Sequence, residues 1–150
     1  MNKDDVISTL NNLIETSKDG ELGFRTCSED ATDPDLKTFL ANRAGKCKNA
    51  AGELQDLVRA LGGEPSSSSS LSGTLHRRWV DIKAAILGRD DEAILNECER
   101  GEDVAKQSYR RALSQDLPIE IHNVVQRQFN GVVENHDMVK VLRDRAHAHS

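Results

Sequence analysis

The sequence predicts an all-α protein built as an antiparallel four-helix bundle. Apolar residues recur at steps of three and four along most of the chain, which is the spacing of one helix face. Asp-Pro and Gly-Gly pairs separate these stretches, and none of them alternates apolar with polar residues as a half-buried strand does. Apolar residues make up 37% of the chain and aromatic residues only 3%, so aliphatic side chains must fill the core. This composition suits a bundle in which each helix buries a single stripe.

The first two helices are predicted from their boundaries as well as their periodicity. The first covers about residues 4–31 and ends at a Thr-Asp-Pro stretch. Asp33 is suited to cap the second helix, and Pro34 to occupy its first turn. The second helix runs to about Leu61, where a glycine pair provides a C-terminal stop. Each helix of roughly 28 residues would span about 42 Å at the usual helical rise.

The second half of the chain predicts two more helices after a crossover. The Ser-rich segment 64–73 is low in complexity and is interpreted as a flexible linker. A third helix begins near Gly73, is kinked or broken near Gly88, and resumes to about Ala112. A turn at 116–118 separates it from the last helix. The sequence thus predicts a single domain of 150 residues, in which a long crossover joins two helical hairpins. This is the layout of ferritin-like bundles.

Six short motifs follow one another along the chain. They are KDGELGF (18–24), GELQ (52–55), LGGEP (61–65), LHRRW (75–79), ECERGED (97–103) and ENHD (134–137). In this order they resemble a bacterial family of ferritin-like four-helix-bundle proteins whose function is unassigned. The resemblance covers nearly the whole chain and implies the ferritin-like fold. It implies no activity, because a fold by itself does not carry a function.

Charge and composition exclude several classes of function. A net charge of −5 and a pI near 5.5 argue against nucleic acid as a partner, because phosphate contacts need a basic surface. No apolar stretch approaches the ~20 residues that span a bilayer, and the start MNKDDVISTLNN lacks the features of a signal peptide. We therefore expect no membrane partner and a cytoplasmic location. Cys27, Cys47 and Cys98 show no CxxC spacing and are expected to be small core residues.

Four ionisable residues interrupt the apolar stripes, one on each predicted helix: Glu21, Arg43, Glu102 and His136. Burial of such groups is costly unless they are paired or bound to a metal. Two interpretations follow. The residues form a structural ion-pair network, or they form a carboxylate–histidine metal site inside the bundle.

The structural network is the interpretation that we favour. With a turn centred near residue 32 or 33, Glu21 and Arg43 would lie at the same height on adjacent helices. Arginine suits such a site because its planar fork can bind a carboxylate through two hydrogen bonds. Glu102 would extend the network, with Gln128 supplying an amide and His136 lying about one helical turn away.

The metal-site interpretation rests on the order of acidic residues. A single Glu alternates with a Glu-x-x-Asp pair, in the order Glu21, Glu53–Asp56, Glu102 and Glu134–Asp137. Ferritin-like di-iron proteins have Glu-x-x-His in place of both pairs. Glu53 would also lie roughly 13 Å beyond the level of Glu21, too far to share an iron ion. We therefore favour no metal or other cofactor; if iron binds, the expected ligands are Glu21, Glu102 and His136.

The sequence therefore predicts a non-catalytic helical module, with a stress-related or scaffold role. The alternative is a metal-binding ferritin-like protein that handles iron or peroxide through core carboxylates and histidine. Long helices with few aromatic residues leave apolar surface beyond a single core, so we also expect a homodimer.

Overall fold

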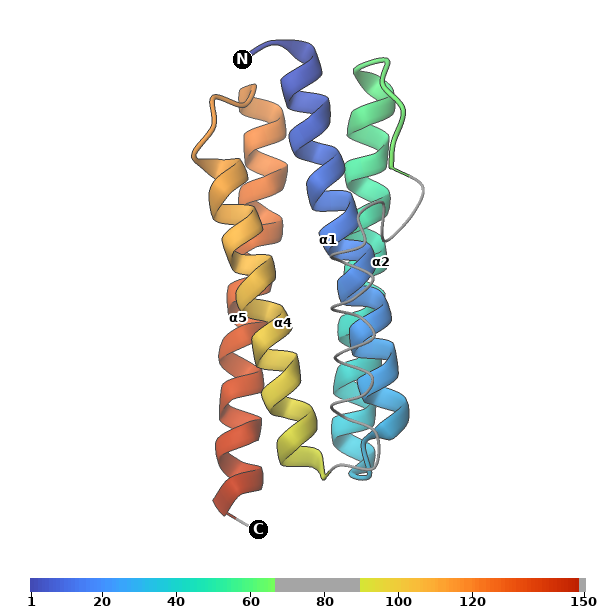
Figure 1. Ribbon diagram of the computed structural model, residues 1–150, viewed down its shortest axis with the longest axis vertical. Coiled ribbons are helices and arrows are strands. Elements are labelled where there is room, and N and C mark those ends of the chain that lie inside the picture. Colours follow the sequence, from blue (N-terminus) through green and yellow to red (C-terminus); the bar gives the residue numbers. More distant parts are fainter. Residues whose placement is uncertain (67–89, 149–150) are drawn as a thin grey trace.

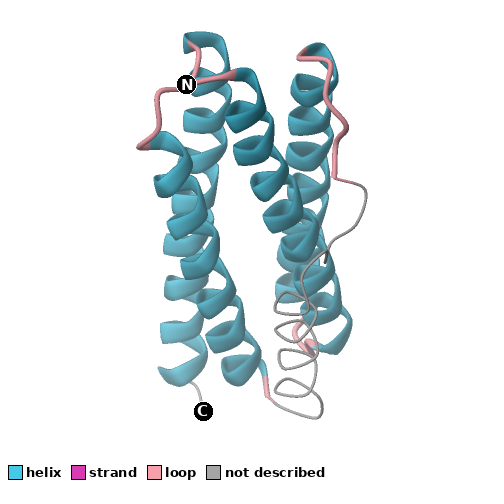
Figure 2. Ribbon diagram, turned by 45° about the horizontal axis from the view of Figure 1, so that its top comes forward, coloured by secondary structure: helices cyan, strands magenta, loops and turns pink. Residues whose placement is uncertain are grey.

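A computed structural model describes residues 1–66 and 90–148 of the protein. Over these residues it contains no strand and four long helices, α1 (Lys3–Asp30), α2 (Pro34–Ala60), α4 (Asp91–Leu113) and α5 (Ile119–Ala148). Two antiparallel hairpins, α1–α2 and α4–α5, stand side by side (Figures 1 and 2). The predicted all-α bundle of two hairpins is confirmed. The predicted linker beyond residue 66, the helix from Gly73 and the break near Gly88 lie outside the described residues.

Local side-chain chemistry sets the helix boundaries. The Asp33 carboxylate accepts a hydrogen bond from the N–H of Asp35 at 3.1 Å and caps α2, as predicted. Asp90 caps α4 in the same way, accepting from the N–H of Ala93 at 2.9 Å. Gly62 ends α2 with φ at 80°, a left-handed conformation that glycine adopts without steric cost.

Asp91 ties one end of the second hairpin to the first. Its carboxylate accepts hydrogen bonds from the N–H of Thr32 at 2.9 Å, the Thr32 hydroxyl at 3.0 Å and the N–H of Asp33 at 3.1 Å. The first turn of α4 is therefore held against the turn between α1 and α2. This contact sets the height of one hairpin relative to the other.

The helices are not packed equally. α1 packs against α2 and α4, and α4 packs against α5, whereas α2 and α5 touch only slightly. α2 and α4 lie across the diagonal of the bundle and their backbones do not pack together. Among the described helices, packing is therefore close on three sides of the bundle and slight on the fourth, between α2 and α5.

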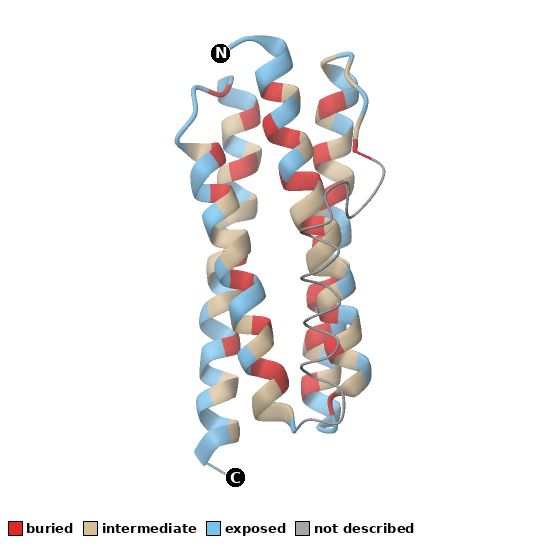
Figure 3. Ribbon diagram, viewed as in Figure 1, coloured by how far each residue is buried: buried red, intermediate tan, exposed pale blue. Residues whose placement is uncertain are grey.

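The core forms two apolar clusters, and Figure 3 shows their buried residues on the faces that the helices turn toward one another. The first cluster includes Leu10, Leu13, Ile14, Leu54, Val58, Tyr109 and Val125. The second includes Phe24, Leu40, Ala44, Ile94, Leu95 and Val139. Polar residues and glycines occupy the intervening helical turns, so the middle of the bundle differs from both ends.

Candidate functional site

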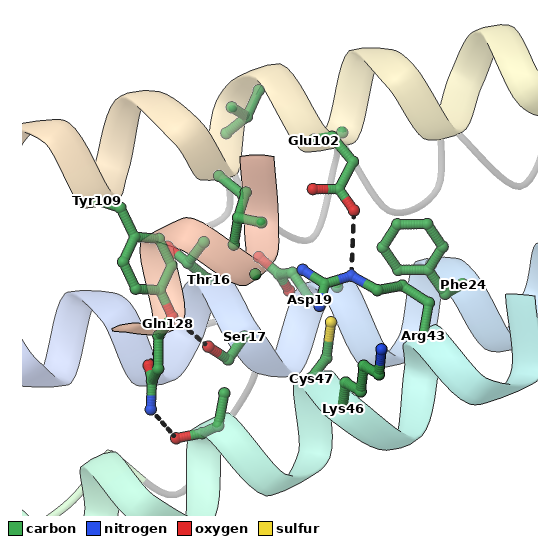
Figure 4. Close-up of a pocket in the computed structure, with 18 of the residues that line it drawn as sticks. Thr16, Ser17, Asp19, Phe24, Arg43, Lys46, Cys47, Glu102, Tyr109 and Gln128 are labelled. Atoms are coloured by element: carbon green, nitrogen blue, oxygen red, sulfur yellow. Dashed lines mark hydrogen bonds and ion pairs between the residues drawn. The ribbon is translucent and has the colours of Figure 1, made fainter. Parts of the chain in front are cut away.

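An ion pair crosses the diagonal of the bundle between the two apolar clusters. Arg43 on α2 donates from Nε to Oε1 of Glu102 on α4 at 3.2 Å (Figure 4). Both residues are buried, with Glu102 only 1% exposed and Arg43 9%. The Asn135 amide on α5 also donates to Oε1. The other oxygen, Oε2, is buried and has no hydrogen-bond partner among the described residues.

The environment of this pair shifts the pKa values of both side chains. Burial raises the pKa of Glu102, although the Arg43 charge and the Asn135 hydrogen bond oppose the shift. Burial also disfavours the charged form of Arg43, but the neighbouring Cys47 and Glu102 more than offset this and raise the pKa of Arg43. The pair is therefore a desolvated charge pair in which Glu102 is the group nearer to neutralisation.

The partner of Arg43 differs from the expected one, Glu21. The Arg43 guanidinium lies 5.7 Å from the centroid of the Phe24 ring, and a Cβ added to Gly20 would lie 3.0 Å from Sγ of Cys47. These contacts place Phe24, not Glu21, at the level of Arg43. These pairs centre the turn midway between residues 33 and 34, and with this centre Arg43 lies three residues further along α1, at the level of Phe24 and not of Glu21. Glu21 is half-buried and forms no ion pair within the described part of the chain.

Gln128 belongs to a second polar network, further along the bundle. The Tyr109 hydroxyl donates to Oε1 of Gln128 at 2.8 Å, and Nε2 of Gln128 donates to Oε1 of Glu53 at 2.8 Å. Arg127 also donates to Glu53, and the Ser17 hydroxyl lies 3.4 Å from that of Tyr109. Burial opposes ionisation of Glu53, but its hydrogen bonds from Arg127 and Gln128 outweigh this and lower its pKa. This network joins α2 to α5, two helices that otherwise touch only slightly.

A cavity of about 450 Å³ lies in the middle of the bundle and is lined by all four described helices. Arg43 and Glu102 stand toward one end, and Tyr109 and Gln128 toward the other, as Figure 4 shows. Small residues leave this space open. Gly23, Gly101 and Gly131 line it, and a Cβ added at any of them would meet no atom within 4 Å.

The three cysteines also line the cavity, and all three are free and buried. Burial raises the pKa of Cys47 to about 11. A hydrogen bond with Cys27, together with burial, raises the pKa of Cys98 well above its usual range. The Cys47 and Cys98 thiols are therefore poor nucleophiles and poor metal ligands, because both kinds of chemistry require the thiolate. All three cysteines form small, buried parts of the cavity wall.

His136 takes part in neither polar network. It is half-buried, and its Nε2 lies 2.9 Å from Oδ1 of Asp103 and 3.9 Å from Oε1 of Glu99, without the angles of a hydrogen bond. Among residues 1–66 and 90–148, no three His, Cys, Asp or Glu side chains converge as they would to hold a metal ion. The Arg43 guanidinium also opposes a cation at Glu102. Within these ranges the structure does not bring Glu21, Glu102 and His136 together in one such group.

Two features of the candidate site were not predicted from the sequence: the cavity and the Tyr109–Gln128–Glu53 network. Glycines on three helices at matching levels were the available signal for the cavity.

No helix in the described ranges is long and apolar enough to cross a membrane.

Comparisons with known proteins agree with the fold. Residues 5–115 match the model of a family described as "Domain of unknown function (DUF2383)". A search of the curated proteins found no match. The structure is similar to that of a mutant of Dps1 from Mycobacterium smegmatis, with a TM-score of 0.78. That match covers 94% of this chain and 96% of the other at 14% sequence identity, which shows a shared ferritin-like fold.

Replacing Arg43 by Met should destabilise the protein by about 3–5 kcal/mol at neutral pH, because Glu102 would be left buried without a partner. The loss should be larger at pH 8 than at pH 5, since protonation neutralises an unpaired Glu102 at low pH. The Arg43→Met, Glu102→Leu double variant should lose much less stability. Urea denaturation at the two pH values gives the free energy of unfolding of the parent protein, the Arg43→Met variant and the double variant. A double variant as unstable as Arg43→Met would contradict the assignment of the loss to a stranded carboxylate.

Proposed function

We propose that this chain, which belongs to the family described as domain of unknown function DUF2383, is a non-catalytic four-helix bundle. We propose further that it binds a small organic molecule in its core cavity. The observation that carries this proposal is the cavity itself, at whose edge a buried carboxylate oxygen lacks a partner among the described residues. Ligand sites in proteins have similar volumes and combine apolar walls with a few polar groups. They also occur between the helices of bundles.

The chemistry of the cavity wall supports binding rather than catalysis. Burial raises the pKa of Tyr109 to about 12 and that of Cys47 to about 11, so both remain protonated at neutral pH. Neither is then suited to act as a base or nucleophile. A scaffold or stress-related role without a ligand is the competing form of this proposal, but such a role gives no reason for an open centre.

Toluene is a suitable probe of the cavity because it tests space and apolar walls alone. We expect toluene to shift amide NMR signals of residues that line the cavity. Gly131→Leu places a side chain in the cavity and should abolish these shifts. Gly45→Leu is the matched control, since Gly45 is also helical, has free space around its Cβ and does not line the cavity. Equal shifts in the Gly131→Leu protein, or none in the parent, would exclude a ligand cavity.

We also propose that the protein is a homodimer. Met138 and Val141, three residues apart on α5, are 48% and 50% exposed, and Leu22 on α1 is 38% exposed. Large apolar side chains that remain exposed on a bundle favour association. Light scattering at tens of micromolar should give the mass of two chains, and Met138→Lys combined with Val141→Lys should give one. A monomeric parent protein would contradict this proposal.

A further inference from the structure

We propose that the cavity selects a small, neutral and largely apolar molecule that carries one hydroxyl group, such as a phenol. This inference rests on the proposed function and adds the chemical class of the ligand. It follows from three properties of the cavity: the hydrogen-bonding capacity left at Arg43 and Glu102, the charge of that pair, and the saturation of the polar groups at the other end.

The unused hydrogen-bonding capacity lies at the Arg43–Glu102 end. Arg43 uses Nε for Glu102, and its two Nη groups form no hydrogen bond with the rest of the described protein. Glu102 accepts both of its bonds at Oε1 and none at Oε2. The two side chains of one ion pair thus leave a donor group and an acceptor atom without a partner among the described residues. A hydroxyl group matches them, because it can donate to a carboxylate oxygen and accept from a guanidinium at once.

The charge of the pair disfavours ionic ligands. A carboxylate that approaches Arg43 also approaches Glu102, and an ammonium that approaches Glu102 also approaches Arg43. In each case one attractive contact is opposed by one repulsive contact, within a buried site where an ion loses its hydration. A neutral ligand avoids both costs.

At the other end of the cavity, Tyr109 and Gln128 use their polar groups in hydrogen bonds with neighbouring residues. The Tyr109 hydroxyl donates to Gln128, and the Gln128 amide donates to Glu53 and to the carbonyl of Ala50. This end therefore offers little to a second polar group on a ligand. The apolar part of the wall includes Phe24, Ala105, Val132 and the buried thiols, and the charged residues Asp19, Lys46 and Glu97 also line the cavity. A largely apolar body with a single hydroxyl at one end complements this arrangement.

Four probes of similar size separate these contributions: toluene, phenol, benzoate and benzylamine, each titrated at neutral pH and followed by NMR. We expect phenol to bind about tenfold more tightly than toluene, as one hydrogen bond to a charged group allows. Benzoate and benzylamine should bind at least about tenfold more weakly than phenol, because each buries a charge.

The Arg43→Met, Glu102→Leu variant supplies the control, because it replaces both charges by apolar groups of similar volume. This variant should lose the preference for phenol over toluene. Equal binding of toluene and phenol by the parent protein, or tightest binding of benzoate or benzylamine, would overturn the inference while leaving the cavity as a ligand site. Binding of none of the four would overturn the proposed function as well.

Discussion

The buried pair of Arg43 and Glu102 is the constraint on which the middle of the bundle depends. It joins α2 and α4, two helices that lie across the diagonal and do not pack against each other. Only a long side chain such as arginine can reach across this distance and keep its charge paired. The pair links the two hairpins at mid-length, while Asp91 links them at one end. Because a lone charge at this depth would be strongly unfavourable, the hairpins are held in the one arrangement that satisfies both groups.

The cavity follows from the same arrangement. Glycines at positions 20, 23, 101 and 131 line the cavity, and bulkier residues at 23, 101 or 131 would extend into open space. The apolar clusters above and below keep their normal packing, so the bundle retains two well-formed cores around an open centre. A protein that needed only stability would gain by filling this centre with aliphatic side chains, since packed cores are more stable than cavities. Binding of a ligand gives a physical reason for leaving it open.

Much of the fold could be predicted from the sequence, because its signals are local. The period of three and four, the Asp33 cap with Pro34, and the glycine stop after Leu61 each act within one helical turn, and each occurs in the structure. The pairing of Arg43 depends instead on the register between helices, where a shift of three residues replaces Glu21 by Phe24. The link from Gln128 to Glu53 and the cavity depend on how the second hairpin packs against the first. No local sequence pattern predicts the distance between the two hairpins.

The most direct test of the buried pair is a pH titration of the Glu102 carboxyl carbon by NMR, in the parent protein and in the Arg43→Met variant. We expect a midpoint above the ordinary value of 4.5 in the parent protein, because burial outweighs the partners of Glu102. A further rise should follow when the Arg43 charge is removed. An ordinary midpoint that does not respond to the loss of Arg43 would show that Glu102 is neither buried nor paired, and would contradict the central role given to this pair.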